Sequence, residues 1–234
     1  MTQTIRTQRP ANLLKHSLAA ATLSLVMALP AQAAGYQAGL MTDYLFRGLT
    51  RTDHGPAVYL QGKTQRGDAY ASVKAINIDT PDGAEGLPVE MDVSFGYNNR
   101  FDSFNIDVEV ITYNFLVDSM ADETEFKLGT RLAKGLDLEL YRGIKGKTWY
   151  PEISYEKFLK NRLYLDGSVG FWKQDDADDT ALTARLELGR DFPEFHGIDI
   201  YGGLDFISDS TPFGNDADKD DSELEFVLGI RKNF

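Results

Sequence analysis

The sequence predicts an antiparallel, up-and-down β-barrel that crosses a membrane with twelve strands. Three observations lead to this prediction. Segments of about ten residues alternate between apolar and polar side chains, their connections take turns at being short and long, and the chain opens with an export signal. Strands that cross a membrane need about 9 to 11 residues, whereas strands average about 5 to 6 residues in water-soluble proteins.

The first 33 residues have the pattern of a secretory signal peptide. Arg6, Arg9 and Lys15 precede the apolar stretch 18–29, and the small residues Ala-Gln-Ala follow at 31–33. A dozen apolar residues are too few for a spanning helix, which needs roughly 20. We therefore expect cleavage before Ala34, which leaves residues 34–234 as one outer-membrane barrel domain.

The connections define the strands in chain order. Short connections, typical of tight hairpin turns, are expected at 65–69, 98–103, 133–136, 159–162 and 191–197. Longer connections are expected at 49–56, 78–88, 117–124, 142–148, 173–180 and 208–222. The two kinds alternate along the whole chain. The segments between them make an even number of strands, with both ends of the barrel domain on the side of the short turns.

The strands differ in how sharply they alternate. Alternation is sharp in the segments 89–97, 104–110, 125–132, 182–188, 198–206 and 224–234, where a helix would scatter the charges around its circumference. It is weaker in 36–47, 57–64 and 148–158, and Pro151 lies within the last of these. The first strand is nevertheless predicted over 36–47.

Alternation alone does not decide which face meets water, because a soluble β-sandwich shares it. Aromatic residues near the segment ends favour the membrane, since such rings prefer its two interfaces. The pairs predicted to lie there are Tyr44 and Phe46, Tyr97 and Phe101, Tyr113 and Phe115, Trp149 and Tyr150, and Phe171 and Trp172.

The last strand ends on an aromatic residue. The apolar face of this strand is formed by Phe226, Leu228, Ile230 and Phe234, and Lys232 interrupts it. In a closed barrel this strand pairs with the first, so that no edge remains. We expect these four residues to form the assembly signal that the barrel-assembly machinery reads.

Composition excludes several functions. Loss of the leader's three bases changes the formal charge from −12 to −15, which argues against nucleic acid. The absence of cysteine excludes disulfides and thiol catalysis. His54 is expected in a long connection and His196 in a short turn at the opposite end, which removes a Ser–His catalytic pair. No enzyme activity, cofactor or resident metal is predicted.

Two acidic segments are expected in the external loops. Residues 215–225 resemble a calcium-binding loop that starts at Asp216, but the sixth position is then Asp221 instead of Gly and the twelfth is Val227 instead of Glu. Together with 175–179 they suggest a solvated acidic crown. One hypothesis is that these loops share divalent cations with the phosphates of outer-membrane lipopolysaccharide.

The segment "TDYLFRGLT" (42–50) closely resembles the opening motif of the TorF family of proteobacterial outer-membrane porins. That motif is an Asp-Tyr-x-Phe-Arg-Gly strand soon after the signal peptide. Length, exported leader, strand rhythm and terminal Phe234 extend the similarity over nearly the whole mature chain, and the match loosens after Gly48. The resemblance implies a porin-like barrel in the cell outer membrane.

The predicted function is passive diffusion of small solutes or ions. Ten acids and six bases on the polar faces predict a weak cation preference. Asp43 and Arg47 would lie about 13 Å apart on one strand, so each needs a partner from another strand, or water. The alternatives are a plugged structural or adhesive barrel and a soluble periplasmic β-sandwich binding protein. The predicted lumen residues are Asp43, Arg47, Lys74, Glu90, Asp92, Asp107, Glu109, Lys127, Arg131, Glu139, Arg185, Glu187, Asp199, Asp205, Glu225 and Arg231.

Overall fold

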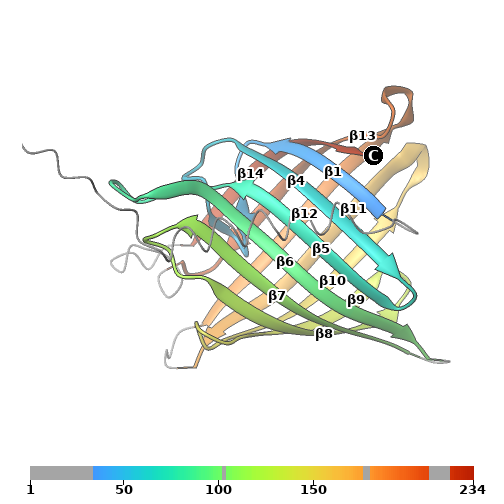
Figure 1. Ribbon diagram of the computed structural model, residues 1–234. Helices are drawn as coiled ribbons and strands as arrows, with labels where there is room; N and C mark the ends of the chain where they lie inside the picture. The colour runs from blue at the N-terminus through green and yellow to red at the C-terminus, as the bar shows by residue number, and fades with distance from the viewer. Residues whose placement is uncertain (1–33, 102–103, 176–179, 211–221) are drawn as a thin grey trace, which may run out of the picture.

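Twelve strands form one closed antiparallel sheet in the computed structural model, which describes residues 34–101, 104–175, 180–210 and 222–234 (Figure 1). The barrel closes where β1 (Ala34–Met41) pairs with β14 (Glu223–Asn233). The predicted barrel is therefore confirmed, and its single closed sheet is not the β-sandwich of the soluble alternative. The predicted signal peptide and most of both predicted acidic segments lie outside the described residues.

The remaining strands of the wall follow in chain order, each paired with its neighbour. They are β4 (Ala57–Arg66), β5 (Ala69–Asn77), β6 (Gly86–Arg100), β7 (Asn105–Val117), β8 (Glu123–Ala133), β9 (Leu136–Gly143), β10 (Thr148–Phe158), β11 (Leu163–Gln174), β12 (Thr180–Phe192) and β13 (Ile198–Ile207). Short 3₁₀ turns, η1 (Lys160–Arg162) and η2 (Pro193–Phe195), join β10 to β11 and β12 to β13. Within the described ranges, no helix is long and apolar enough to span a membrane.

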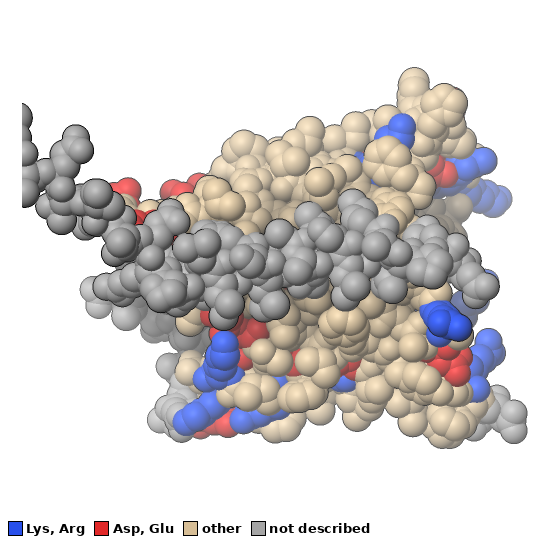
Figure 2. Space-filling model, viewed as in Figure 1, with Lys and Arg blue, Asp and Glu red and all other residues tan. Residues whose placement is uncertain are grey.

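The outward face of the wall is apolar, as the alternation predicts. Large side chains such as Phe95 and Leu128 are more than half exposed, while charged neighbours on the same strands turn inward. Figure 2 shows charged side chains gathered towards the two ends of the barrel, with mostly uncharged surface on the uncovered wall between them. Such an exposed apolar band suits hydrocarbon and would be costly in water.

The C-terminus is held by the closure of the barrel. The β1–β14 ladder runs from Gln37 opposite Asn233 to Met41 opposite Gly229, and the Phe234 N–H donates to the Tyr36 carbonyl at 2.9 Å. The four residues of the predicted assembly signal have outward, exposed side chains, from Ile230 at 40% to Phe234 at 70%. The last residue is thus part of the wall and not a loose end.

The prediction of a first strand over 36–47 is wrong beyond Met41. At Thr42 the chain leaves the wall, and it returns only at Ala57. Between these points it forms a small hairpin of β2 (Leu45–Phe46) and β3 (Leu49–Thr50). We call this the inner hairpin. It keeps the two-residue alternation of a strand, which is why sequence reasoning extended β1 through it.

The prediction that the paired aromatic residues lie at the interfaces is wrong for six of the ten residues. Adjacent residues of a strand face opposite sides, so Trp149 and Phe171 are exposed whereas their neighbours Tyr150 and Trp172 are buried. Residues in the interior, contrary to prediction, are Tyr44, Phe46, Tyr113, Phe115, Tyr150 and Trp172. The outward ones are Tyr97, Phe101, Trp149 and Phe171.

Inward tyrosines pack flat over glycines of the neighbouring strand. Tyr164 lies opposite Gly189 in the β11–β12 ladder, and a Cβ at Gly189 would overlap its ring. The same relation recurs along the wall, where a ring can lie against a bare backbone and fill the space near the strands. The other directly opposed pairs are Tyr59 with Gly39, Tyr70 with Gly96, and Tyr201 with Gly229.

Replacing Gly189 by Ala should therefore destabilise the barrel, because the new methyl group displaces the Tyr164 ring. We expect a loss of about 1–3 kcal/mol in the free energy of unfolding, measured by urea titration in detergent micelles. Gly129→Ala is the matched control, since its added Cβ would lie 3.5 Å from its nearest neighbours. Equal losses in the two variants would contradict this account of the packing.

Candidate functional site

The inner hairpin turns through a tight two-residue loop inside the barrel. Its central residues, Arg47 (φ 55°) and Gly48 (φ 87°), both have positive φ, as a type I′ hairpin turn requires. A Cβ at Gly48 would lie 2.9 Å from the Ile207 Cβ of β13. The turn therefore lies directly against the inner surface of the wall, and glycine allows this close approach.

Arg47, at the tip of the hairpin, is bound to the far wall. Its Nη1 and Nη2 atoms donate to Oε1 and Oε2 of Glu125 on β8, both at 2.8 Å. The two side chains are only 7% and 3% exposed. A bidentate ion pair that is shielded from water in this way is strongly directional. Loss of either partner would leave an uncompensated buried charge.

Aromatic rings surround the Arg47 guanidinium. Its Cζ lies 4.0 Å from the ring centroid of Tyr150 and 5.4 Å from that of Trp172. Phe46, the preceding residue, packs edge-on against Trp172 and against Tyr113 of β7. These contacts replace part of the hydration that the cation loses. They also hold the hairpin between β7 and β11.

The base of the hairpin is tied by a second set of hydrogen bonds. Asp43 Oδ1 accepts from the hydroxyl groups of Thr50 and Thr52, at 2.7 and 2.8 Å. The Tyr44 hydroxyl donates to Glu90 Oε1 on β6 at 2.9 Å. Burial, and then the neighbouring Glu90 charge, raises the pKa of Tyr44 well above its usual value, so this hydroxyl stays protonated and donating.

The wall charges near the hairpin form clusters. Lys127 Nζ lies 2.7 Å from Glu109, 2.9 Å from Asp107 and 3.4 Å from Glu139. On the other side of the barrel, Arg231 lies 3.1 Å from Glu187 and 3.3 Å from Asp199. Most of the interior charge is therefore compensated locally, across neighbouring strands.

A polar cavity of about 390 Å³ lies beside the hairpin. Leu45, Arg47 and Gly48 form one side of it, and inward residues of β10 to β14 form the other. Its charged lining comprises three guanidinium groups and four carboxylates: Arg47, Arg185, Arg231, Glu152, Asp166, Glu187 and Asp205. A polar space of this size has room for water and small hydrophilic solutes.

The structure places the sequence-predicted residues in three settings. Asp43 and Arg47 belong to the hairpin segment and not to the wall, and Arg47 finds its partner on a distant strand while Asp43 finds partners locally. Arg131 lies near a short turn, where its side chain is 60% exposed and pairs with Asp137. The others occupy inward positions of wall strands: Lys74, Glu90, Asp92, Asp107, Glu109, Lys127, Glu139, Arg185, Glu187, Asp199, Asp205, Glu225 and Arg231.

Several residues of the site were missed by sequence reasoning. Glu125 shares the inward face of β8 with Lys127, so its alternation could have indicated it. Glu152 and Asp166 line the cavity from β10 and β11. The tyrosines of the interior were missed because their rings resemble those of interfacial residues. Only the pairing of strands distinguishes an interior tyrosine from an interfacial one.

Solved porins have the same fold. The KdgM porin aligns with a TM-score of 0.56 at 9% identity, over 86% of this chain and 98% of that chain. The NanC porin aligns with a TM-score of 0.55 at 10% identity, over 86% and 99%. A KdgM porin in complex with disordered oligogalacturonate aligns with a TM-score of 0.54, also at 10% identity, over 86% and 98%.

No curated protein matches the chain in sequence. Residues 30–191 match the model of a family described as bacterial protein of unknown function (Gcw_chp). Because this match covers more than half of the sequence and includes the inner hairpin, the chain belongs to the Gcw_chp family.

Proposed function

We propose that the protein is an outer-membrane, porin-like channel whose inner hairpin forms the constriction. The observation that carries this proposal is the position of the hairpin: it leaves the wall at Thr42, crosses the lumen and reaches Glu125 on β8. A polar cavity remains beside it. Small solutes or ions would diffuse passively along this side of the barrel.

Three features support the outer membrane as its location. The outward face is apolar and exposed, and every strand of the wall is paired on both sides, as hydrocarbon demands. The fold is that of solved porins. The resemblance of residues 42–50 to the TorF opening motif and the predicted signal peptide agree with export to that membrane.

The interior charges favour cations weakly. Apart from Arg131, which lies exposed near a short turn, the predicted lumen residues comprise ten acids and five bases, and the cavity adds Glu152 and Asp166, which form no ion pair within the described ranges. Fixed charges that line a narrow passage set its preference among ions. We therefore propose a cation or a small neutral solute as the cargo, in contrast to the polyanionic oligogalacturonate of the KdgM complex.

Purified protein reconstituted in planar bilayers should give conductance steps. In a KCl gradient, the reversal potential should have the sign of a modest K⁺ preference, because carboxylates exceed bases along the passage. Protein-free detergent is the control. A preference for Cl⁻ would contradict the proposed role of the carboxylates. The absence of conductance steps would contradict the proposed channel.

A plugged structural or adhesive barrel is the second candidate. The buried ion pair and the rings around Arg47 favour it, since they hold the hairpin firmly across the lumen. Under this alternative the hairpin closes the barrel fully. A variant that releases the inner hairpin from β8 distinguishes the constricted channel from the plugged barrel.

Replacing Arg47 by Asn should release the tip of the hairpin from β8, while the αL backbone that Asn tolerates is retained. For a constricted channel we expect larger conductance steps than in the wild type, and a loss of about 3–5 kcal/mol in the free energy of unfolding from the unpaired Glu125. The matched control is Arg131→Asn, which breaks the exposed pair with Asp137 and should change neither value appreciably. Unchanged conductance in Arg47→Asn would exclude the hairpin as the constriction, and conductance that appears only in this variant would establish the plug.

A further inference from the structure

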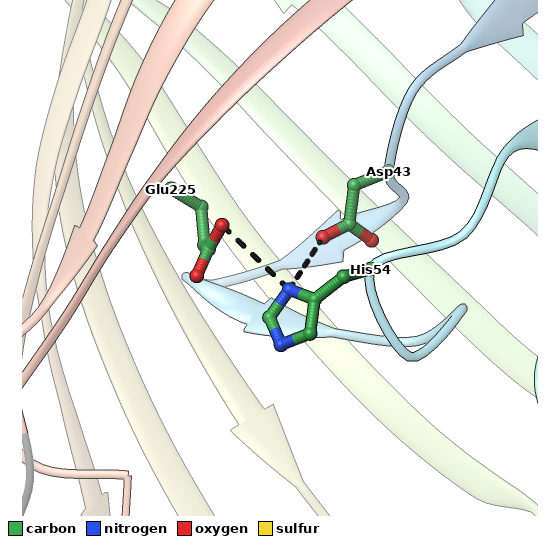
Figure 3. A group of neighbouring side chains, drawn as sticks. All are labelled: Asp43, His54 and Glu225. Atoms are coloured by element: carbon green, nitrogen blue, oxygen red, sulfur yellow. Dashed lines mark ion pairs between the residues drawn. The ribbon is translucent and has the colours of Figure 1, made fainter.

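Three potential metal ligands meet beside the base of the inner hairpin. Asp43 precedes β2, His54 lies in the segment that leads from the hairpin back to the wall, and Glu225 faces inward from β14 (Figure 3). One ligand atom of each lies within 4.8 Å of the other two. Residues far apart in the sequence are therefore brought together by barrel closure and by the inward fold of residues 42–56.

The Asp43 carboxylate is oriented towards this point. Asp43 is 5% exposed, and its Oδ1 is saturated by the hydroxyl groups of Thr50 and Thr52. Its Oδ2 is buried and accepts no hydrogen bond. A buried carboxylate oxygen without a donor is costly. Hydroxyl donors that fix one oxygen while the other remains available form the kind of support that surrounds metal ligands.

Two of the three distances between ligand atoms match those of a tetrahedral ion, and the third lies within 4.8 Å. The His54 Nδ1 atom lies 3.3 Å from Asp43 Oδ2 and 3.6 Å from Glu225 Oε2. Bonds of about 2.0–2.2 Å from zinc to nitrogen and oxygen, at tetrahedral angles, place neighbouring ligand atoms about 3.3–3.6 Å apart. An octahedral ion at similar bond lengths would need about 3.0 Å between adjacent ligands.

The charges of the three side chains also favour a divalent transition-metal ion. Within the described residues, His54 is the only ion-pair partner of Asp43 and of Glu225. The nearby Asp205 of β13 lies opposite Glu225 in the β13–β14 ladder and opposite Arg185 in the β12–β13 ladder. Two carboxylates and a neutral imidazole around a divalent cation form a neutral centre. Imidazole favours zinc and related transition metals over calcium or magnesium.

We propose that Asp43, His54 and Glu225 bind one zinc-type transition-metal dication. His54 is 54% exposed at its side chain, so the ion has access to the site and a fourth position is open to water. Bound metal links the base of the inner hairpin to β14. The proposal concerns binding and does not depend on conduction through the barrel.

The test uses the full mature protein in detergent, titrated with Zn²⁺ alone by calorimetry. We expect one equivalent to bind to the wild type, with an affinity at least about tenfold lower in His54→Asn and in Glu225→Gln, since each loses a ligand. His196→Asn is the matched control: His196 has the same φ of 58° as His54 but follows η2 at a short turn. Equal zinc affinity in the His54 variant and the control would overturn the proposal.

Cobalt gives a readout independent of the variants. Co²⁺ in a tetrahedral site absorbs visible light strongly, whereas Co²⁺ bound loosely by exposed carboxylates does not. We expect this absorption in the wild type, its displacement by Zn²⁺, and no displacement by equimolar Ca²⁺. Absence of the tetrahedral spectrum would overturn the site even if a variant failed to fold, and displacement by Ca²⁺ would assign the binding to carboxylates alone.

Discussion

Closure of the sheet is the constraint on which the rest of the structure depends. In hydrocarbon no water is present to satisfy backbone groups, so the strand that begins the wall must pair with the strand that ends it. The β1–β14 ladder does this, and the Phe234 amide completes it. Once the ring is closed, every second side chain must face inward. The polar residues of the sequence then have only one another, the hairpin and enclosed water as partners.

The interior shows how these enclosed charges are accommodated. Ion pairs join neighbouring strands, as between Lys127 and Glu109, and tyrosine hydroxyls extend the same networks, as between Tyr164 and Arg231. Removing charges from water is expensive unless each finds a partner. The pairing therefore fixes side chains that would otherwise move freely in a wide lumen, and it leaves only a fraction of the carboxylates without a nearby cationic side chain.

The strand pattern could be predicted from the sequence because lipid on one side imposes it. Alternation such as that of Leu186 and Leu188 with Glu187 predicts a strand with one apolar face, and β10 was predicted from the sequence over the residues where the structure places it. The inner hairpin could not be predicted in this way. Its residues alternate like a strand, and its turn uses Arg47 before Gly48 where Asn or Asp is the usual signal. The partner of Arg47 depends on which strands face each other across the lumen, and that information is absent from local sequence.

The inner hairpin has a mechanical consequence for the barrel. Its turn is held to Glu125 on β8 and lies against Ile207 on β13, strands that stand nearly across the ring from each other. The ladders hold the closed ring of strands around its circumference but supply no contact across its diameter, so they do little to prevent flattening. A brace between opposite sides opposes that flattening. The cross-section of this barrel is thus set partly from within, by the fifteen residues between β1 and β4.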